Sequence, residues 1–495
     1  MSSKLPKRPW CRVTMQLENV DASFLSESTS YFPYKMKKRT TTPLCQTVIA
    51  SLCLFLAACG GDDPAQTTGS SPTSSSPSVP HSYTIGGTVT GLVSGSQVTL
   101  VDNGSDSITV SANGTFSFAG ALVSGSQYAA TMDAQPMGLT CTVTNGSGTV
   151  GTVNVTNIAV TCSRIEYAYV ANAGNNTVSQ YTIGASGAFA PVTPPAVAAG
   201  RNPISVTIDP TGRYAYAANE GDDTVSEYTI GASGALTPMA TATVTAGTQP
   251  ISVTVDPTGS YAYVANSSDN TVSEYTIDAS GALTPMATAT VPTGSTPYSI
   301  TVDPDGRYAY VANYSDGTLS QYTIGASGAL TPMVPATVAA GNLPFSVTVD
   351  PTGSYAYVAN AGNNTVSQYT IGASGALTPM ATATVAAGTH PISVTVDPLG
   401  RYAYVANFID GTVSQYTIGA SGALTPMVPA TVAAGSLPYS VTIDPTGRYA
   451  YAANEGDYTV SEYTIGASGA LTPMVTPTVP TNEPVFVTTT YAATQ

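Results

Sequence analysis

The side chains able to carry out acid–base or nucleophilic chemistry are few in this sequence. Only two histidines occur in 495 residues, His81 and His390, so a multi-histidine metal site is excluded. Beyond Cys59 the chain has six arginines, no lysine and 26 acidic residues, a net charge of −20. Neutralisation of phosphates supplies most of the affinity for nucleic acid, so this charge excludes nucleic-acid binding. Schiff-base chemistry needs a lysine and is excluded too, and we expect neither a metal nor a cofactor.

Two residues between 200 and 400 are candidates for catalysis. Arg201 and His390 both lie just before a proline, in the segments Arg201-Asn202-Pro203 and Thr389-His390-Pro391. An arginine and a histidine together can polarise a carbonyl group and move a proton. The alternative is that each is an ordinary member of a variable loop.

Aromatic residues close to carboxylates form a second candidate site. Aromatic rings stack on the apolar faces of sugars and peptides, while carboxylates accept their hydrogen bonds. The alternative is structural, because a large residue at the start of a strand packs between neighbours and carboxylates cap turns. The candidate ligand-binding residues are Tyr298, Tyr314, Phe345, Phe408, Tyr439, Tyr458, Glu220, Asp222, Glu455 and Asp457.

A repeat of 47 residues positions these candidates. Periods of 40–50 residues with strand-like content indicate a β-propeller with one four-stranded blade per repeat. In one repeat, the expected strands A, B, C and D cover 205–208, 214–217, 224–230 and 239–244, with A innermost. The tripeptide Tyr-Ala-Tyr marks strand B and starts at Tyr167, Tyr214, Tyr261, Tyr308, Tyr355, Tyr402 and Tyr449.

The number of repeats predicts how the propeller closes. Strands B to D occur seven times, but strand A precedes only six of them. The segment 484–490 resembles the missing strand, since Pro484-Val485-Phe486-Val487-Thr488 is similar to Pro438-Tyr439-Ser440-Val441-Thr442. We therefore predict that 484–490 pairs with the blade at Tyr167 and closes a ring of seven over 164–490.

The loops of the repeat fall into two sets. The A–B turn is Asp-Pro-x-Gly throughout, and the C–D turn is Gly-Ala-Ser-Gly except where Asp278 replaces the first glycine. At Asp278 we expect a positive φ, which aspartate tolerates better than most residues. The D–A and B–C loops vary from repeat to repeat and share the opposite face, so we expect binding there.

The repeat motifs also resemble a known family. Tyr261-Ala262-Tyr263-Val264-Ala265-Asn266, followed by Asn270-Thr271-Val272-Ser273, is similar to the YVTN-repeat propellers and to the seven-bladed lactonase family, which includes 6-phosphogluconolactonases. The resemblance covers about residues 164–490. It implies a seven-bladed propeller and hydrolysis of a cyclic ester, but the motifs are scaffold residues and identify no catalytic residue. The variable face carries many acidic residues and a single arginine, Arg201, which argues against a phosphorylated lactone as the substrate.

Residues 83–163 are expected to form a small immunoglobulin-like β-sandwich of about seven strands. Three Asn-Gly pairs, at Asn103, Asn113 and Asn145, predict hairpins because Asn-Gly readily adopts positive φ. Cys141 and Cys162 remain as a pair after export, so a disulfide is predicted.

The amino-terminal part has the pattern of an export signal. Basic residues 36–39 precede a short apolar stretch, and Leu56-Ala57-Ala58-Cys59 resembles the bacterial lipobox. We expect 36–58 to be a lipoprotein signal peptide, Cys59 to carry the lipid, and 59–82 to be a Ser/Pro/Thr-rich tether. Residues 1–35 fit poorly before a signal peptide, so we expect translation to begin at Met36 or this segment to be disordered.

These features predict a lipid-anchored protein of the bacterial cell envelope, on the outer membrane. The leading interpretation is an all-β protein whose propeller binds a carbohydrate, peptide or protein on its variable face. The alternative is a lactonase, and a structural surface repeat protein is the third.

Overall fold

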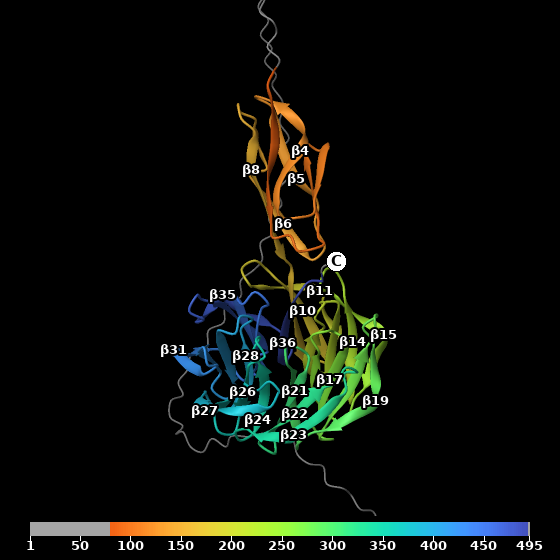
Figure 1. Ribbon diagram of the computed structural model, residues 1–495, viewed down its shortest axis with the longest axis vertical. Coiled ribbons are helices and arrows are strands. Elements are labelled where there is room, and N and C mark those ends of the chain that lie inside the picture. Colours follow the sequence, from red (N-terminus) through yellow and green to blue (C-terminus); the bar gives the residue numbers. More distant parts are fainter. Residues whose placement is uncertain (1–79, 494–495) are drawn as a thin grey trace, which may run out of the picture. The chain divides into compact units, whose positions relative to one another are not determined.

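The computed structural model describes residues 80–493, and every regular element in this range is a β-strand (Figure 1). The predicted segment 1–35, the signal peptide, the lipidation site Cys59 and most of the tether lie outside the described residues. Within 80–493 no helix is long and apolar enough to cross a membrane.

Residues 82–164 form two four-stranded sheets around one apolar core. The sheets have the strand orders β4-β1-β8-β6 and β3-β2-β5-β7. β1 and β8 run parallel. Ile85, Leu100, Phe118 and Ile158 lie in the shared core. The packed sheets contain eight strands where about seven were expected, and the immunoglobulin-like type stays a prediction. The strands are β1 (Ser82–Thr90), β2 (Val98–Asp102), β3 (Asp106–Val110), β4 (Gly114–Val123), β5 (Gln127–Ala134), β6 (Leu139–Thr144), β7 (Ser147–Thr149) and β8 (Val155–Arg164).

Only one of the three Asn-Gly pairs makes the predicted hairpin. Asn103 and Gly104, with φ of 49° and 72°, lie in the tight turn between the paired strands β2 and β3. The predictions at Asn113 and Asn145 are wrong, because the strand that follows each pair lies in the other sheet. Asn113 instead uses its side-chain amide to bond the backbone N–H and C=O of Leu92, both at 2.8 Å.

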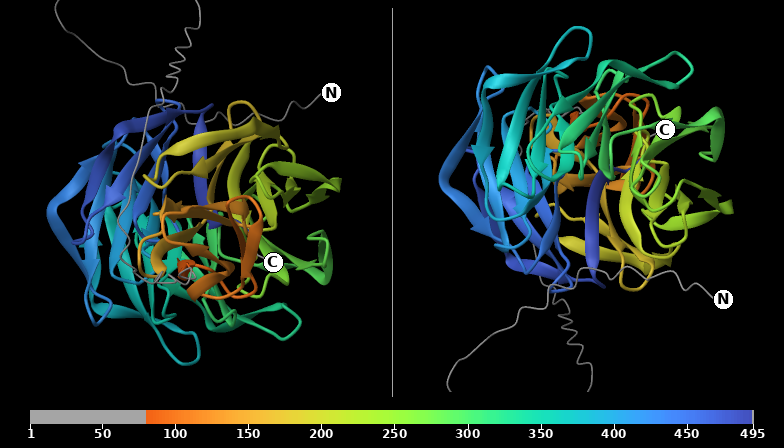
Figure 2. Two further views of the ribbon diagram at one scale, coloured as in Figure 1. Left: turned by 90° about the horizontal axis from the view of Figure 1, so that it is seen from above. Right: turned by 90° about the horizontal axis from the view of Figure 1, so that it is seen from below.

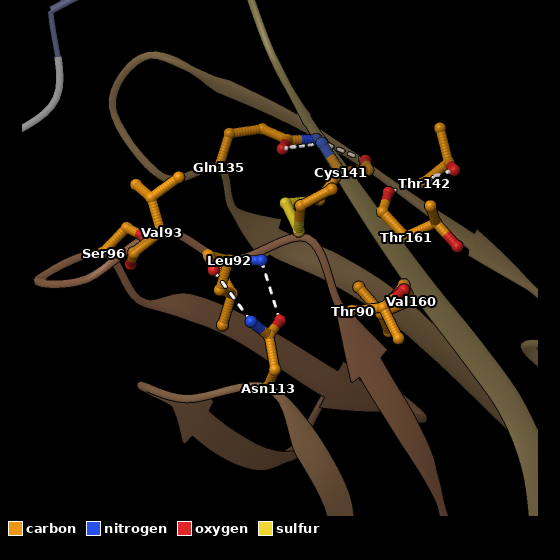
Figure 3. Close-up of a disulfide and its surroundings, with 11 residues drawn as sticks. Thr90, Leu92, Val93, Ser96, Asn113, Gln135, Cys141, Thr142, Val160 and Thr161 are labelled. Carbon is orange, nitrogen blue, oxygen red and sulfur yellow. Dashed lines mark hydrogen bonds between the residues drawn. A yellow bond between two sulfur atoms is a disulfide. The ribbon is translucent and has the colours of Figure 1, made fainter. Parts of the chain in front are cut away.

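The predicted disulfide between Cys141 and Cys162 is confirmed (Figure 3). The two cysteines are directly opposite each other on the paired strands β6 and β8. Gln135 bonds both the N–H and the C=O of Cys141, at 2.8 and 2.9 Å, and fixes this corner of the sheet. The disulfide therefore joins strands that already share a core.

Residues 166–491 form the predicted seven-bladed propeller, with each blade a four-stranded antiparallel sheet. We number the blades 1 to 7 along the chain and give the strands from the inside outward. Blade 1 is β36 (Pro484–Tyr491), β9 (Glu166–Asn172), β10 (Thr177–Ile183) and β11 (Phe189–Ala198). Blade 2 is β12 (Pro203–Ile208), β13 (Tyr214–Asn219), β14 (Thr224–Ile230) and β15 (Leu236–Thr245).

The other five blades repeat the same arrangement. Blade 3 is β16 (Pro250–Val255), β17 (Tyr261–Asn266), β18 (Thr271–Ile277) and β19 (Leu283–Pro292), and blade 4 is β20 (Pro297–Val302), β21 (Tyr308–Asn313), β22 (Thr318–Ile324) and β23 (Leu330–Ala339). Blade 5 is β24 (Pro344–Val349), β25 (Tyr355–Asn360), β26 (Thr365–Ile371) and β27 (Leu377–Ala386). Blade 6 is β28 (Pro391–Val396), β29 (Tyr402–Asn407), β30 (Thr412–Ile418) and β31 (Leu424–Ala433), and blade 7 is β32 (Pro438–Ile443), β33 (Tyr449–Asn454), β34 (Thr459–Ile465) and β35 (Leu471–Pro480).

The innermost strand of blade 1 comes from the carboxy-terminal end of the chain. β36 pairs antiparallel with β9, from Pro484 opposite Asn172 to Tyr491 opposite Glu166. Figure 2 shows the blades arranged around a central axis, with the deep-blue β36 beside the yellow strands of blade 1. β36 therefore covers the inner edge of β9, which would otherwise be exposed and would favour aggregation.

The Tyr-Ala-Tyr motif holds neighbouring blades together. Tyr261 and Tyr263 of β17 donate hydrogen bonds to the carbonyls of Ala326 and Gly328 in the C–D turn of the next blade, at 3.2 and 2.6 Å. The other six blades make the same two contacts, including blade 7 with blade 1. The motif is thus scaffold, as expected.

A side chain in the middle of each strand C makes a second bond between blades. Glu274 accepts a hydrogen bond from the N–H of Leu330, which begins the outer strand of the next blade, at 2.6 Å. The same position is glutamine in four blades and glutamate in three, and all seven make this bond. The glutamines also donate to a carbonyl of their own outer strand. An ionised glutamate cannot donate in this way.

The expectation for Asp278 is wrong. The residue with positive φ in its turn is Gly281, at 84°. Asp278 accepts hydrogen bonds from the N–H groups of Ser280 and Ala282, at 2.7 and 3.1 Å. The first turn position therefore does not require a left-handed backbone, and aspartate is accommodated there.

Candidate functional site: the mouth of the central channel

The seven innermost strands line a central channel with a ring of serines near one end. In six blades the serine Oγ accepts the N–H of the next innermost strand at 3.0–3.4 Å, as in the bond from Val253 to Ser205. In blade 1 this position is Phe486, which has no hydroxyl. The serines are Ser205, Ser252, Ser299, Ser346, Ser393 and Ser440.

Above the serines the channel is almost filled by side chains. The cavity between the serine ring and the first residues of the inner strands has a volume of about 60 Å³. This volume is well below the roughly 300 Å³ of small ligand pockets, so a sugar ring does not fit inside the cavity. A larger cavity of about 230 Å³, lined by serines and threonines, lies further along the channel. A sugar-sized ligand would therefore lie across the mouth, above the small cavity.

The loops of the mouth are held by backbone hydrogen bonds and by aspartate and asparagine side chains of the B–C loops. In every blade the residue before the strand-A proline has a φ of 52–58°, and its carbonyl accepts a hydrogen bond of 2.9–3.1 Å from the first residue after strand B. Positive φ is costly for a residue such as Thr296 or Leu343, and such strain concentrates at functional sites. Because the backbone makes these bonds, the side chains at the mouth are free to vary.

One sector of the mouth is a continuous aromatic cluster. Tyr298 packs against Tyr314 and Phe345, with ring centroids 4.8 and 4.7 Å apart. Tyr439 links Phe345 to Phe408, at 5.8 and 6.0 Å. We call these five residues the aromatic floor. All five are among the ligand-binding residues predicted from the sequence, and they come from the inner strands and B–C loops of blades 4 to 7.

The remaining sector carries three glutamates. Glu220 and Glu455 directly follow strand B in blades 2 and 7, and Glu483 precedes the inner strand of blade 1. They therefore belong to consecutive blades of the closed ring. Glu220 accepts a hydrogen bond from Asn202. The backbone N–H of Glu455 donates a hydrogen bond to the carbonyl of Leu437 at 3.0 Å. We call these three residues the acidic sector.

Electrostatic effects connect the two sectors. Burial, together with Tyr298 and the charges of Glu455 and Glu220, raises the pKa of Tyr439 far above its usual value. Burial, together with Tyr314 and the charge of Glu220, also raises the pKa of Tyr298. Both tyrosines therefore keep their protons at neutral pH and act as hydrogen-bond donors.

The pKa values of two of the glutamates are raised as well. Burial raises the pKa of Glu220, and the hydrogen bond from Asn202 opposes this. Burial and the neighbouring charge of Glu483 raise the pKa of Glu455. A carboxylate with a raised pKa is a stronger base than one in water, which is the property needed to take a proton from water.

The two candidates for catalysis are not brought together. The side chain of Arg201 is 74% exposed, and its guanidinium lies 3.9 Å from Asp222 in the same blade. His390 packs beside Phe408, with ring centroids 6.0 Å apart, and burial lowers its pKa. The imidazole is therefore neutral at pH 7 and extends the aromatic floor.

Three of the expected ligand-binding residues lie outside the aromatic floor and the acidic sector. Asp222 and Asp457 accept hydrogen bonds from the N–H groups of Arg201 and Ser436 and so cap the D–A loops. Tyr458 is 54% exposed, has a φ of 56°, and makes no ring contact with the described aromatic residues.

Neither Glu483 nor the serine ring was predicted from the sequence as part of the site. Glu483 occupies the repeat position of Asn202 and His390, so its place at the mouth follows once 484–490 is accepted as strand A. The serines are identical in six repeats at a position that faces the channel. That regularity was the available signal, and it marks a bond between blades.

Solved structures confirm this architecture. The chain is similar to a protein of Bacteroides fragilis provisionally named a 6-phosphogluconolactonase, with a TM-score of 0.59 and 20% identity over 66% of this chain and 98% of that one. It is similar to the periplasmic gluconolactonase of Pseudomonas aeruginosa, with a TM-score of 0.57 and 20% identity over 66% and 99% of the two chains. At this level of identity the similarity is one of fold. Among curated protein sequences, none matches the chain.

The sequence profile described as "Lactonase, 7-bladed beta-propeller" matches residues 123–248 and 231–485. Together these matches span most of the chain and every complete repeat. The chain belongs to the seven-bladed β-propeller lactonase family.

Proposed function

We propose that this protein hydrolyses the lactone of a sugar acid at the mouth of its channel. The observation that carries the proposal is the meeting of the aromatic floor with the acidic sector at Tyr439, which lies in the same blade as Glu455. Family membership favours this hydrolase, the alternative of the sequence analysis, over a binding platform. The sugar ring would lie across the mouth, because the cavity below it is too small.

The residues have the properties that the reaction requires. Glu455 takes a proton from a water molecule whose oxygen attacks the lactone carbonyl carbon. Tyr439 and Tyr298, which remain protonated, donate hydrogen bonds to the carbonyl oxygen as negative charge develops on it. The ring C–O bond then breaks, and the proton passes from Glu455 to the departing alkoxide. The product is the open hydroxy acid.

Hydrolysis of a lactone panel that includes gluconolactone and 6-phosphogluconolactone tests this proposal. We expect Glu455→Gln to lower kcat/KM by about 100-fold or more, and Tyr439→Phe by roughly tenfold or more. Asp305→Asn, on the opposite face and exposed, is the matched control and keeps the wild-type rate. Absence of turnover above buffer on every lactone would refute the proposal, as would an undiminished rate in Glu455→Gln.

A second candidate is a protein that binds a sugar or peptide at the same mouth without catalysis. It is favoured by Arg201, whose exposed side chain is paired with Asp222, so that no described residue at the mouth supplies a cation to stabilise an oxyanion. Tight sugar binding without turnover would support this candidate.

We propose in addition that a lipid on Cys59 holds the protein on the bacterial outer membrane. The lipobox-like segment before Cys59 supports this, and a disulfide is typical of exported proteins. Cys59→Ser is expected to move the protein from the membrane fraction to the soluble fraction.

A further inference from the structure

We propose that the ligand of this mouth carries a protonated amino group, held by the acidic sector while the rest of the molecule lies on the aromatic floor. This inference rests on the proposed site and names the chemical class that the site prefers.

The charge of the mouth is one-sided. Glu455, Glu483 and Glu220 belong to consecutive blades, and the charge of Glu483 raises the pKa of Glu455. Arg201, the arginine in the D–A loop that leads into blade 2, is exposed and paired with Asp222. Four other arginines follow the A–B turns at the opposite end of the blades, Arg164 lies over the ring of Tyr491, and no lysine occurs beyond residue 38. The three carboxylates therefore have no cationic partner at the mouth among the described residues.

These carboxylates do not form a metal site. Within residues 80–493, no group of three or more acidic, histidine or cysteine side chains is arranged to hold a metal ion. Glu220 is already engaged by Asn202. A larger cation that meets separate carboxylates fits this arrangement better than a compact metal ion does.

The aromatic floor supplies the second element of cation recognition. The ring of Tyr439 lies between Phe345 and Phe408, within 6.0 Å of each, and its pKa responds to both Glu220 and Glu455. An ammonium group within about 6 Å of a ring centroid is attracted to the ring face. A cation above Tyr439 would gain from the rings and the carboxylates together.

The same geometry predicts an order of affinity for three classes of ligand. A phosphorylated sugar would be repelled by the acidic sector, and a neutral sugar would gain only stacking and hydrogen bonds. An amino sugar, or the lactone of an amino sugar acid, would gain the charge interaction as well. The amine would also favour the ionised form of Glu455.

Binding of two sugars that differ in charge tests the inference directly. Glucosamine and N-acetylglucosamine share a ring, but only glucosamine is charged at pH 7. We expect glucosamine to bind about fivefold more tightly by isothermal titration calorimetry. The preference should fall to within about twofold in the Glu220→Gln/Glu455→Gln double variant and persist in Asp305→Asn. The melting temperature of each variant establishes that it is folded.

Several outcomes would overturn the inference. They are equal or tighter binding of N-acetylglucosamine, an unchanged preference in the double variant, and no detectable binding of glucosamine at millimolar concentration.

Hydrolysis separates this inference from the proposed function. Equal turnover of gluconolactone and glucosaminic acid lactone overturns the inference and leaves the lactonase proposal standing. Selective binding of glucosamine with no turnover of either lactone supports the inference and overturns the lactonase proposal.

Discussion

The loops on the two faces of the propeller are held by different hydrogen bonds. On the turn face, a buried aspartate of the Asp-Pro-x-Gly turn accepts several backbone N–H bonds, as Asp256 does from Thr258, Ser260 and Tyr261 at 2.7–3.0 Å. At the mouth, the residue before each proline is held through its own carbonyl and a positive φ. A position that holds the turn through its own side chain has its residue type fixed, whereas the residue before the proline is held through its backbone and its side chain is free for binding.

The comparison depends first on a closed ring, and removal of 484–495 should have the largest effect. This truncation exposes the edge of β9 and removes the buried side chains of Val485 and Val487. We expect the melting temperature to fall by about 10 °C or more, measured by calorimetry. A chain lacking only 494–495 is the control, and an unchanged melting temperature in the longer truncation would contradict closure by β36.

Aspartates on the two faces provide the next comparison. Asp256→Ala leaves three partly buried N–H groups without their acceptor and should lower the free energy of unfolding by about 3 kcal/mol. Asp269→Ala, at the mouth, removes one exposed bond to Thr248 and should cost about 1 kcal/mol. Urea denaturation measures both, with Asp256→Asn as the isosteric control. Equal losses would remove the distinction between the faces.

Between the faces, Glu462 introduces a pH dependence into the bonds between blades. Burial raises its pKa to about 6, against 4.5 for an ordinary glutamate, although it accepts a hydrogen bond from Phe189. A raised pKa in the folded state stabilises below pH 4.5, and this contribution is lost as the pH rises through about 6.

Glu462→Gln should therefore raise stability at pH 7.5 by about 1–2 kcal/mol and change it little at pH 4.5. Melting temperatures across this range test the prediction, with Gln415→Glu at the same repeat position as the reciprocal variant. Equal effects of Glu462→Gln at both pH values would contradict the assigned pKa.

Substitution of Arg201 should have the smallest effect, and it tests whether this residue contacts the ligand at the mouth. Because its side chain is exposed and paired only with Asp222, Arg201→Ala should change the melting temperature by less than about 1 °C and sugar binding by less than about twofold. A large loss of binding would place Arg201 at the ligand and weaken the case for a cationic ligand.

Much of the fold was accessible from the sequence, because a propeller repeats local patterns. The 47-residue period predicts each blade, and the missing strand A predicts the pairing of β36 with β9. The Asn-Gly pairs were less informative, since Asn113 and Asn145 satisfy the same local rule as Asn103 while the chain crosses to the other sheet. Local turn preference does not determine which sheet the next strand joins.

The sequence by itself therefore determined the all-β class, the seven blades, the disulfide and the face that varies. Only the tertiary structure decided which side chains meet at the mouth. Tyr314 and Phe408 join the aromatic floor, Glu483 joins the acidic sector, and Arg201 turns away. The physical reason is that a repeat predicts where each backbone position lies within a blade. Contacts across the channel depend on the closed ring and on the direction in which each side chain leaves its strand or loop.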